Sequence, residues 1–100
     1  MPNPPEDPEI TGTAGFELEV SWSAPATGFY DYYLLRYAPI GETDYEEVQV
    51  LASDTASYML TGLDPETSYD ISIVTVQGEG MSEPAQVYGT TGNVMVMYLL

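Results

Sequence analysis

Carboxylates are the side chains through which this chain could most readily do chemistry. The 100 residues include sixteen aspartates and glutamates, a single basic residue, Arg36, and no histidine or cysteine, for a net charge of −15. Two carboxyl groups can work together as a general acid and a general base. In a chain with this many carboxylates, close pairs arise without any catalytic purpose, so proximity alone does not indicate an active site.

The residue types that build most nucleophilic active sites are missing. Without histidine the chain lacks the commonest general base, and without lysine it cannot form a serine–lysine pair. Without cysteine it has no thiol nucleophile, no disulfide and no cysteine-based metal or redox site. We therefore expect no enzymatic activity and no cofactor.

Two acidic clusters are the candidates for a metal site. Glu42, Asp44, Glu46 and Glu47 surround a predicted turn, and a second cluster lies near the start of the chain. Calcium takes about six to eight oxygen ligands, and neither cluster has the glycine-punctuated spacing of an EF-hand loop. We expect a solvated acidic surface with no metal site; weak calcium binding is a hypothesis that rests on charge density alone.

The negative charge also restricts the partners of the chain. It should repel nucleic acid, heparin and acidic lipid surfaces. Two interpretations of the charge remain: it attracts a basic partner, or it only keeps copies of the chain apart. No stretch approaches the roughly 18 apolar residues of a membrane span. The proline-rich residues 1–6 have neither the basic nor the apolar region of a signal peptide.

Alternating apolar and polar residues predict strands along the whole chain. Phe16, Leu18, Val20 and Trp22 alternate with polar residues, the pattern of a strand with one buried face. Similar runs, separated by proline and glycine turns, predict seven strands, at 7–12, 16–23, 32–38, 45–51, 56–61, 69–76 and 83–90. We expect a proline-rich lead-in at 1–6, one domain at 7–91 and an apolar tail at 92–100.

The run from Leu63 to Tyr69, with Pro65 inside it, precedes the sixth predicted strand. This spacing is typical of a tyrosine corner, in which a buried ring binds nearby backbone through its hydroxyl group. Together with Trp22, the corner resembles the fibronectin type III domain. The Tyr-x-Leu-x-Tyr pattern at 33–37 and the Gly-Glu-Gly-Met-Ser-Glu-Pro sequence at 78–84 carry the same resemblance, and residues 36–40 look like tenascin-type repeats.

The resemblance implies an all-β, seven-stranded, immunoglobulin-like Greek-key sandwich, with strands A-B-E packed on C′-C-F-G. It implies a non-catalytic, extracellular or secreted module for protein recognition, adhesion or spacing. An engineered scaffold of the same fold is the alternative, because a natural chain of this length without lysine is unusual. The chain has no Arg-Gly-Asp sequence, so integrin binding by that route is not expected.

The predicted core can be named residue by residue. Its members are Leu18, Val20, Trp22, Leu35, Tyr37, Leu60, Leu63, Tyr69, Ile71 and Ile73. Thr75 departs from the family pattern, which places a small apolar residue there. A buried threonine needs a partner for its hydroxyl group, and we expect a backbone carbonyl.

Three loops gather at one end of such a sandwich and are the candidate binding surface. They are the BC loop at 24–31, the DE loop at 52–55 and the FG loop at 77–82. The candidate protein-binding residues are Phe29, Tyr30, Asp31, Glu79, Gly80 and Met81. The alternatives are that Phe29 and Tyr30 fold back to cap the core, or that a sheet face binds the partner.

The tail has a composition unlike the rest of the chain. Seven consecutive apolar residues, 94–100, follow Gly92 and Asn93. The tail is either a remnant or the truncated start of a following segment, a strand that pairs with a sheet edge and could join two copies, or a disordered end.

Overall fold

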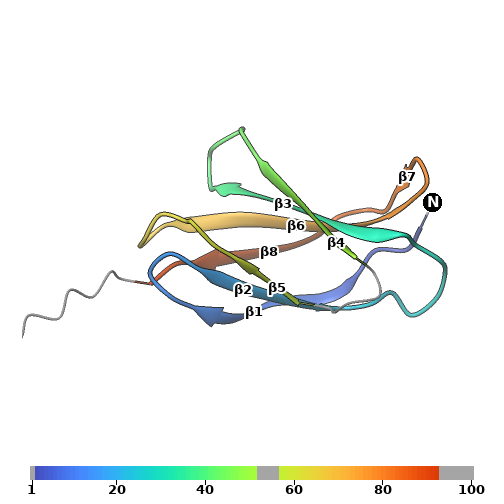
Figure 1. Cartoon of the computed structure of the whole chain (residues 1–100), viewed down its shortest axis with the longest axis horizontal. Helices are drawn as coiled ribbons and strands as arrows, with labels where there is room; N and C mark the ends of the chain where they lie inside the picture. Colours follow the sequence, from blue (N-terminus) through green and yellow to red (C-terminus); the bar gives the residue numbers. More distant parts are fainter. Residues whose placement is uncertain (1, 52–56, 93–100) are drawn as a thin grey trace, which may run out of the picture.

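The computed structural model describes residues 2–51 and 57–92, which form two β-sheets packed face to face (Figure 1). The strands are β1 (Glu6–Thr13), β2 (Leu18–Ser23), β3 (Tyr32–Pro39), β4 (Glu46–Leu51), β5 (Ser57–Leu60), β6 (Ser68–Gln77), β7 (Gly80–Met81) and β8 (Ala85–Thr90). The all-β prediction is confirmed. No helix among these residues is long and apolar enough to cross a bilayer.

The strand order is that of the predicted sandwich. One sheet has the order β1-β2-β5, and the other has the order β4-β3-β6, with β7 and β8 both paired to β6. All pairings are antiparallel. The eighth strand, β7, is a two-residue addition that the sequence placed inside the FG loop.

The break between β7 and β8 has a local cause. Pro84 has no N–H to donate to a ladder, and the backbone leaves β6 just before it. Ser82 holds the chain in place at this point: its N–H donates to the Thr75 carbonyl, and its Oγ accepts from the Thr75 N–H, both at 2.9 Å. Ser82 therefore keeps one backbone hydrogen bond to Thr75 and supplies its hydroxyl oxygen as the acceptor of the second.

The core lies between the two sheets. The predicted core residues are buried there with the exception of Tyr37, which is half-buried and packs against them, and Tyr33 and Val50 join them. Trp22 meets Tyr33 edge to face, with ring centroids 5.1 Å apart and planes at 71°. Strand alternation therefore predicted the inner faces of both sheets well.

Phe16 is a correction to the predicted second strand. We expected its side chain on the buried face, but it is 51% exposed. Strand β2 begins only at Leu18, because a turn closed by the hydrogen bond from Ala14 N–H to Glu17 O occupies the preceding residues. The carbonyl of Phe16 accepts from the Leu63 N–H, so this residue contributes its backbone to the fold while its ring lies outside.

The tyrosine corner is present as predicted. The hydroxyl oxygen of buried Tyr69 accepts a hydrogen bond from the Asp64 N–H at 2.8 Å. Thr91 completes the corner: its hydroxyl donates to the Asp64 carbonyl at 2.6 Å and accepts from the Thr67 N–H at 2.9 Å. Backbone polar groups of the turn are thus satisfied by one side chain from the adjoining strand, Tyr69, and one from near the end of the described chain, Thr91.

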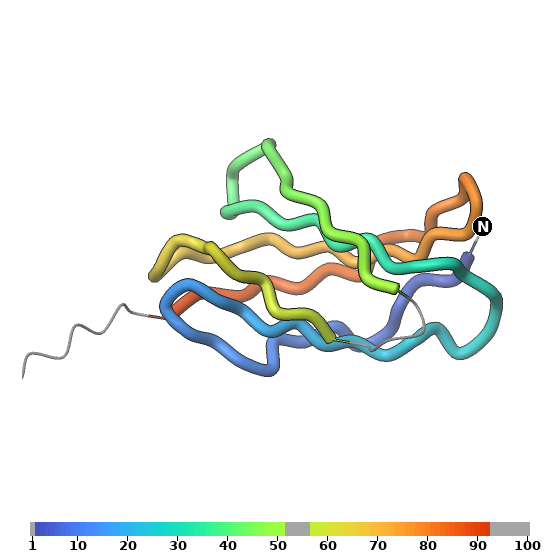
Figure 2. The backbone as a smooth tube through the Cα atoms, viewed as in Figure 1, coloured from blue at the N-terminus to red at the C-terminus, as the bar shows by residue number. Residues whose placement is uncertain are grey.

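Residues 2–5, which we call the N-terminal clasp, pack against the loop end of the sandwich (Figure 2). The Asn3 side-chain amide donates to both the carbonyl and the hydroxyl oxygen of Thr27, each at 3.0 Å. The Asn3 carbonyl accepts from the Thr75 hydroxyl at 2.6 Å, which confirms the expected backbone partner of this buried threonine. The division into lead-in, domain and tail stays a prediction.

The two ends of the described chain lie at opposite ends of the sandwich. The N-terminal clasp lies beside the BC and FG loops, and the chain reaches Gly92 beside the tyrosine corner (Figures 1 and 2). The DE loop and the residues after Gly92 fall outside the described residues, so the structure does not test the predictions about them.

Candidate protein-recognition site

The BC and FG loops are joined to each other by Asp31. Its carboxylate accepts from the Gly78 N–H at 2.7 Å, and its own N–H donates to the Val76 carbonyl at 2.7 Å. Gly78 has a φ of +58°, a conformation that a residue without a side chain adopts most easily. Asp31 therefore fixes the loop end, and its carboxylate is already engaged in doing so.

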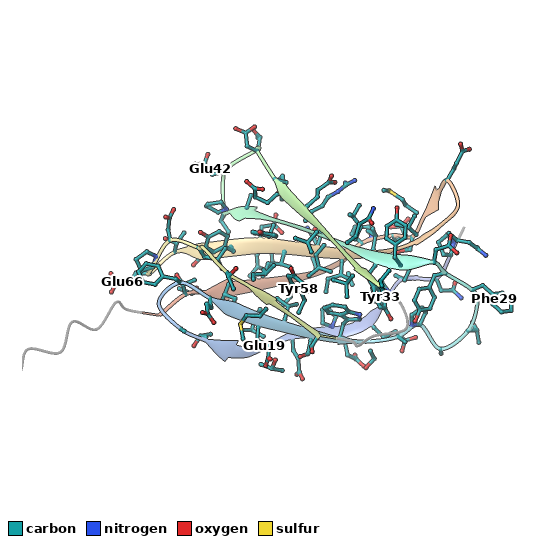
Figure 3. The ribbon with its side chains drawn as sticks, in the orientation of Figure 1. Glu19, Phe29, Tyr33, Glu42, Tyr58 and Glu66 are labelled. Carbon is teal, nitrogen blue, oxygen red and sulfur yellow. The ribbon has the colours of Figure 1, made fainter. Side chains whose placement is uncertain are left out.

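Phe29 and Tyr30 are neighbours with opposite placements. The Tyr30 hydroxyl lies 2.9 Å from the Tyr33 hydroxyl, and the two rings are 5.1 Å apart, so Tyr30 folds back onto the core. Phe29 is 83% exposed, and Figure 3 shows it pointing away from the molecule at the far end of the BC loop. Tyr30 therefore caps the core and Phe29 does not, and partner binding by these residues stays a prediction.

The anchor beneath the BC loop affects the ionisation of Tyr33. Burial of the ring, with a further contribution from the hydrogen bond to Tyr30, raises the pKa of Tyr33 to about 12. The neutral phenol of Tyr33 is thus strongly preferred at this position.

The three FG-loop candidates are also placed differently from one another. Glu79 is exposed at the turn, and Gly80 is half-buried. Gly80 and Met81 form β7, in which Met81 is the register partner of Val76. Met81 therefore belongs to the outer face of the five-stranded sheet rather than to the tip of the loop.

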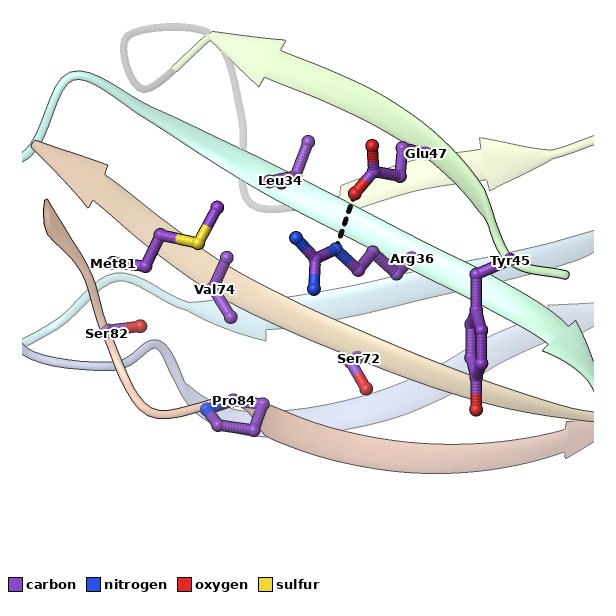
Figure 4. A pocket seen from close by; sticks show the side chains of 9 residues that line it. All are labelled: Leu34, Arg36, Tyr45, Glu47, Ser72, Val74, Met81, Ser82 and Pro84. Atoms are coloured by element: carbon purple, nitrogen blue, oxygen red, sulfur yellow. Dashed lines mark hydrogen bonds and ion pairs between the residues drawn. The ribbon is translucent and has the colours of Figure 1, made fainter. Parts of the chain in front are cut away.

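This outer face carries a groove of about 420 Å³ (Figure 4). Residues that line it are Leu34, Arg36, Tyr45, Val74, Met81 and Pro84. Leu34 and Val74 are buried, and with Val76 and half-buried Tyr32 they form a second apolar cluster, separate from the core. A sheet face was expected as a binding surface only in general terms, and no pattern in the sequence indicated this groove.

Two polar contacts cross the same face. The Arg36 Nε and a Glu47 carboxylate oxygen form an ion pair at 2.5 Å, with both side chains about half exposed. The Tyr45 hydroxyl donates to Asp70 at 3.0 Å, and this hydrogen bond is the main reason that the pKa of Tyr45 is raised. The one arginine of the chain is therefore already paired with a carboxylate.

The acidic clusters do not converge in the described residues. Within residues 2–51 and 57–92, no three metal-ligating side chains lie close enough to hold an ion together. The expectation of a metal-free, cofactor-free domain stays a prediction from the sequence.

An antiparallel two-sheet sandwich, closed by a tyrosine corner and presenting loops at one end, defines the immunoglobulin-like class of modules. Within this class the chain belongs to the fibronectin type III family, because the sequence model described as "Fibronectin type III domain" matches residues 3–90.

Curated relatives include several tenascins. The chain is 33% identical to tenascin of Gallus gallus over 87 residues, which is 87% of this chain and 5% of that protein. It is 39% identical to tenascin-N of Homo sapiens over 84 residues, which is 82% of this chain and 6% of that protein. The chain thus spans about a twentieth of the length of these relatives.

Solved structures give the same result. A segment of two fibronectin type III domains from chicken tenascin superposes with a TM-score of 0.81 at 30% identity, covering 89% of this chain and 49% of that one. A computationally redesigned β-sandwich protein superposes with a TM-score of 0.83 at 28% identity, covering all of both chains.

Proposed function

We propose that this domain is a non-catalytic recognition and spacing module of an extracellular protein, and that it contacts a protein partner through the joined BC and FG loops. The observation that carries the proposal is the exposure of Phe29, at 83%, on a loop whose base is fixed. Extracellular location and the absence of enzymatic activity are inferred from the tenascin relatives.

The fixed base of the BC loop makes Phe29 suitable for recognition. Tyr30 anchors the loop on Tyr33, Asp31 ties it to Gly78, and Asn3 holds Thr27 from the other side. A loop that is already ordered loses little conformational entropy when it binds. Aromatic side chains are frequent among the residues that dominate binding energy at protein interfaces.

A cell-attachment assay on the immobilised domain tests this proposal. Phe29→Ala should reduce attachment roughly tenfold, since truncating a dominant interface aromatic typically costs about 1.4 kcal/mol or more. Phe16→Ala is the matched control, because Phe16 is also exposed but lies near the corner end of the sandwich. Equal attachment by both variants would count against the loop end, and no attachment by the parent would leave only the spacing role.

An engineered binding or stability scaffold is the second candidate. The missing lysines and the similarity to a redesigned sandwich over the whole length of both chains favour it. Redesigned and idealised proteins are often hyperstable, so a melting temperature above roughly 90 °C would support this candidate. A melting temperature of about 45–65 °C, the usual range for natural mesophilic domains, would argue against it.

A further inference from the structure

The outer face of the five-stranded sheet, which no second sheet covers in the described residues, carries several exposed apolar side chains. Of the eight large apolar side chains exposed in the described residues, Tyr45, Leu51, Met81 and Tyr88 lie on it. The register places Leu51 beside Tyr32, and Met81 beside Val76. Leu51 and Met81 therefore extend the buried outer cluster at its margins.

The groove on this face has a defined shape. Its floor consists of Leu34 from β3 and Val74 from β6, which are register partners on adjacent strands. Met81 and Pro84 bound it toward the FG loop, and Tyr45 lies at the other end (Figure 4). At about 420 Å³, the groove has the volume of a small binding pocket and is large enough for an apolar side chain of a bound segment.

The charge around the groove indicates which kind of partner can bind there. Glu47 neutralises Arg36, the one basic residue of the chain, which leaves Asp70 and the other fourteen carboxylates without counter-charge from this protein. A second copy of the chain would bring the same negative charge and no lysine, so electrostatic repulsion opposes it. A positively charged partner is attracted to the same face.

We propose that this groove binds a basic segment of a protein partner. One apolar side chain of the segment would be seated on Leu34 and Val74, and flanking lysine or arginine side chains would face Asp70, whose charge no basic side chain of this protein balances. The surface is distinct from the tip of the BC loop, since Phe29 does not line the groove.

Peptide titration of the isotope-labelled full chain, followed by amide resonances, tests the proposal. The probe is the capped peptide Lys-Lys-Ser-Leu-Ser-Lys-Lys, compared with one in which serine replaces the leucine and one in which glutamate replaces every lysine. Shifts should cluster at Leu34, Ser72, Val74 and Met81. The leucine peptide should bind at least about tenfold more tightly than the serine peptide, because the groove buries its side chain. The glutamate peptide should not bind.

Two methionines provide a matched pair of variants. Met81 is 40% exposed beside the groove, and Met59 is 43% exposed on β5 of the opposite sheet. Met81→Arg and Met59→Arg make the same change in charge and in side chain, but only the first places a cation where the peptide lies. Met81→Arg should weaken binding of the leucine peptide about fivefold or more, and Met59→Arg should leave it near the parent value. The dispersion of the amide spectrum reports whether each variant is folded.

Several results would overturn the proposal. Equal weakening by both methionine variants, or equal affinity for the leucine and serine peptides, would mean that general charge attraction is responsible. Groove amides that shift when residues 93–100 are removed would make that segment the occupant. A dimer by light scattering whose dissociation shifts the same amides would make a second copy the occupant. Phe29→Ala should not affect peptide binding, so failure of the groove and failure of the loop proposal are distinguishable.

Discussion

Strands β3 and β6 carry an apolar cluster on each of their two faces, and the clusters differ in what covers them. On the inner face, Leu35 and Ile73 are completely buried beneath the β1-β2-β5 sheet. On the outer face, Leu34 and Val74 are almost as well buried, but only by neighbouring side chains of their own sheet and by groove walls. The inner cluster therefore holds the two sheets together, and the outer cluster leaves a surface that a partner can complete.

The adjacent leucines of β3 test this comparison most directly. Leu35→Ala should lower the free energy of unfolding by about 2–5 kcal/mol, because it leaves a cavity between the sheets. Leu34→Ala should cost about 1–2 kcal/mol, because the groove already deprives its side chain of packing partners on one side. Urea denaturation of the two variants measures both values, and equal losses would show that the outer cluster is as important for folding as the core.

Alkaline pH should destabilise the inner face through Tyr33. Its pKa is about 12 in the folded chain and about 10 in the unfolded chain, so above pH 10 the unfolded chain loses the proton first. Stability should therefore be constant with respect to this group below pH 10 and fall by about 2 kcal/mol as the pH approaches 12. Urea midpoints between pH 9 and 12 measure the loss, and the Tyr33→Phe variant should show a shallower decline than the parent.

The tyrosine corner offers a second polar test on the core side of the molecule. Tyr69→Phe removes the acceptor of the Asp64 N–H and should cost about 1–3 kcal/mol. Tyr88→Phe is the control, because Tyr88 is well exposed on the outer face, and it should change stability by less than about 0.5 kcal/mol. If the two thermal midpoints fell by the same amount, the corner hydrogen bond would have no special role.

Salt should stabilise the fold slightly but weaken peptide binding at the outer face. Its effect on stability should be the smallest of those predicted. Raising the ionic strength from low to moderate screens the repulsion among the carboxylates and should raise the melting temperature slightly, corresponding to less than about 1 kcal/mol. The same salt should weaken binding of the basic peptide at the outer face. A melting temperature that fell with salt would mean that self-repulsion does not limit the stability of the fold.

The sequence predicted the inner face better than the outer face for a physical reason. Alternation marks a strand with one buried side, and it correctly placed Leu18, Val20 and Trp22 in the core. On β3 and β6 the apolar residues are consecutive, and such runs indicate burial on both faces without showing what covers the second one. The run at 73–76 was the signal for the outer cluster.

The contacts at the loop end were also only partly predictable from the sequence. The need of Thr75 for a backbone carbonyl was predictable because burial of an unpaired hydroxyl is costly, but the residue that supplies this acceptor, Asn3, is 72 residues away in sequence. The separate placements of Phe29 and Tyr30 depend on a hydrogen bond between two tyrosine hydroxyls, which no spacing rule indicates. Contacts between loops are set by tertiary geometry, and local sequence patterns do not encode them.

The N-terminal clasp also determines how the domain would respond to tension. Because the described chain enters at the loop end and reaches Gly92 at the corner end, a pull along the long axis loads Asn3 before it loads β1. The three hydrogen bonds of Asn3 to Thr27 and Thr75 would then bear the load at the entry end, as the Thr91 hydroxyl and the corner bear it at the other end. Release of Asn3 would free the BC loop from one of its supports without opening the core, so a modest force could alter how Phe29 is presented while the sandwich stays folded.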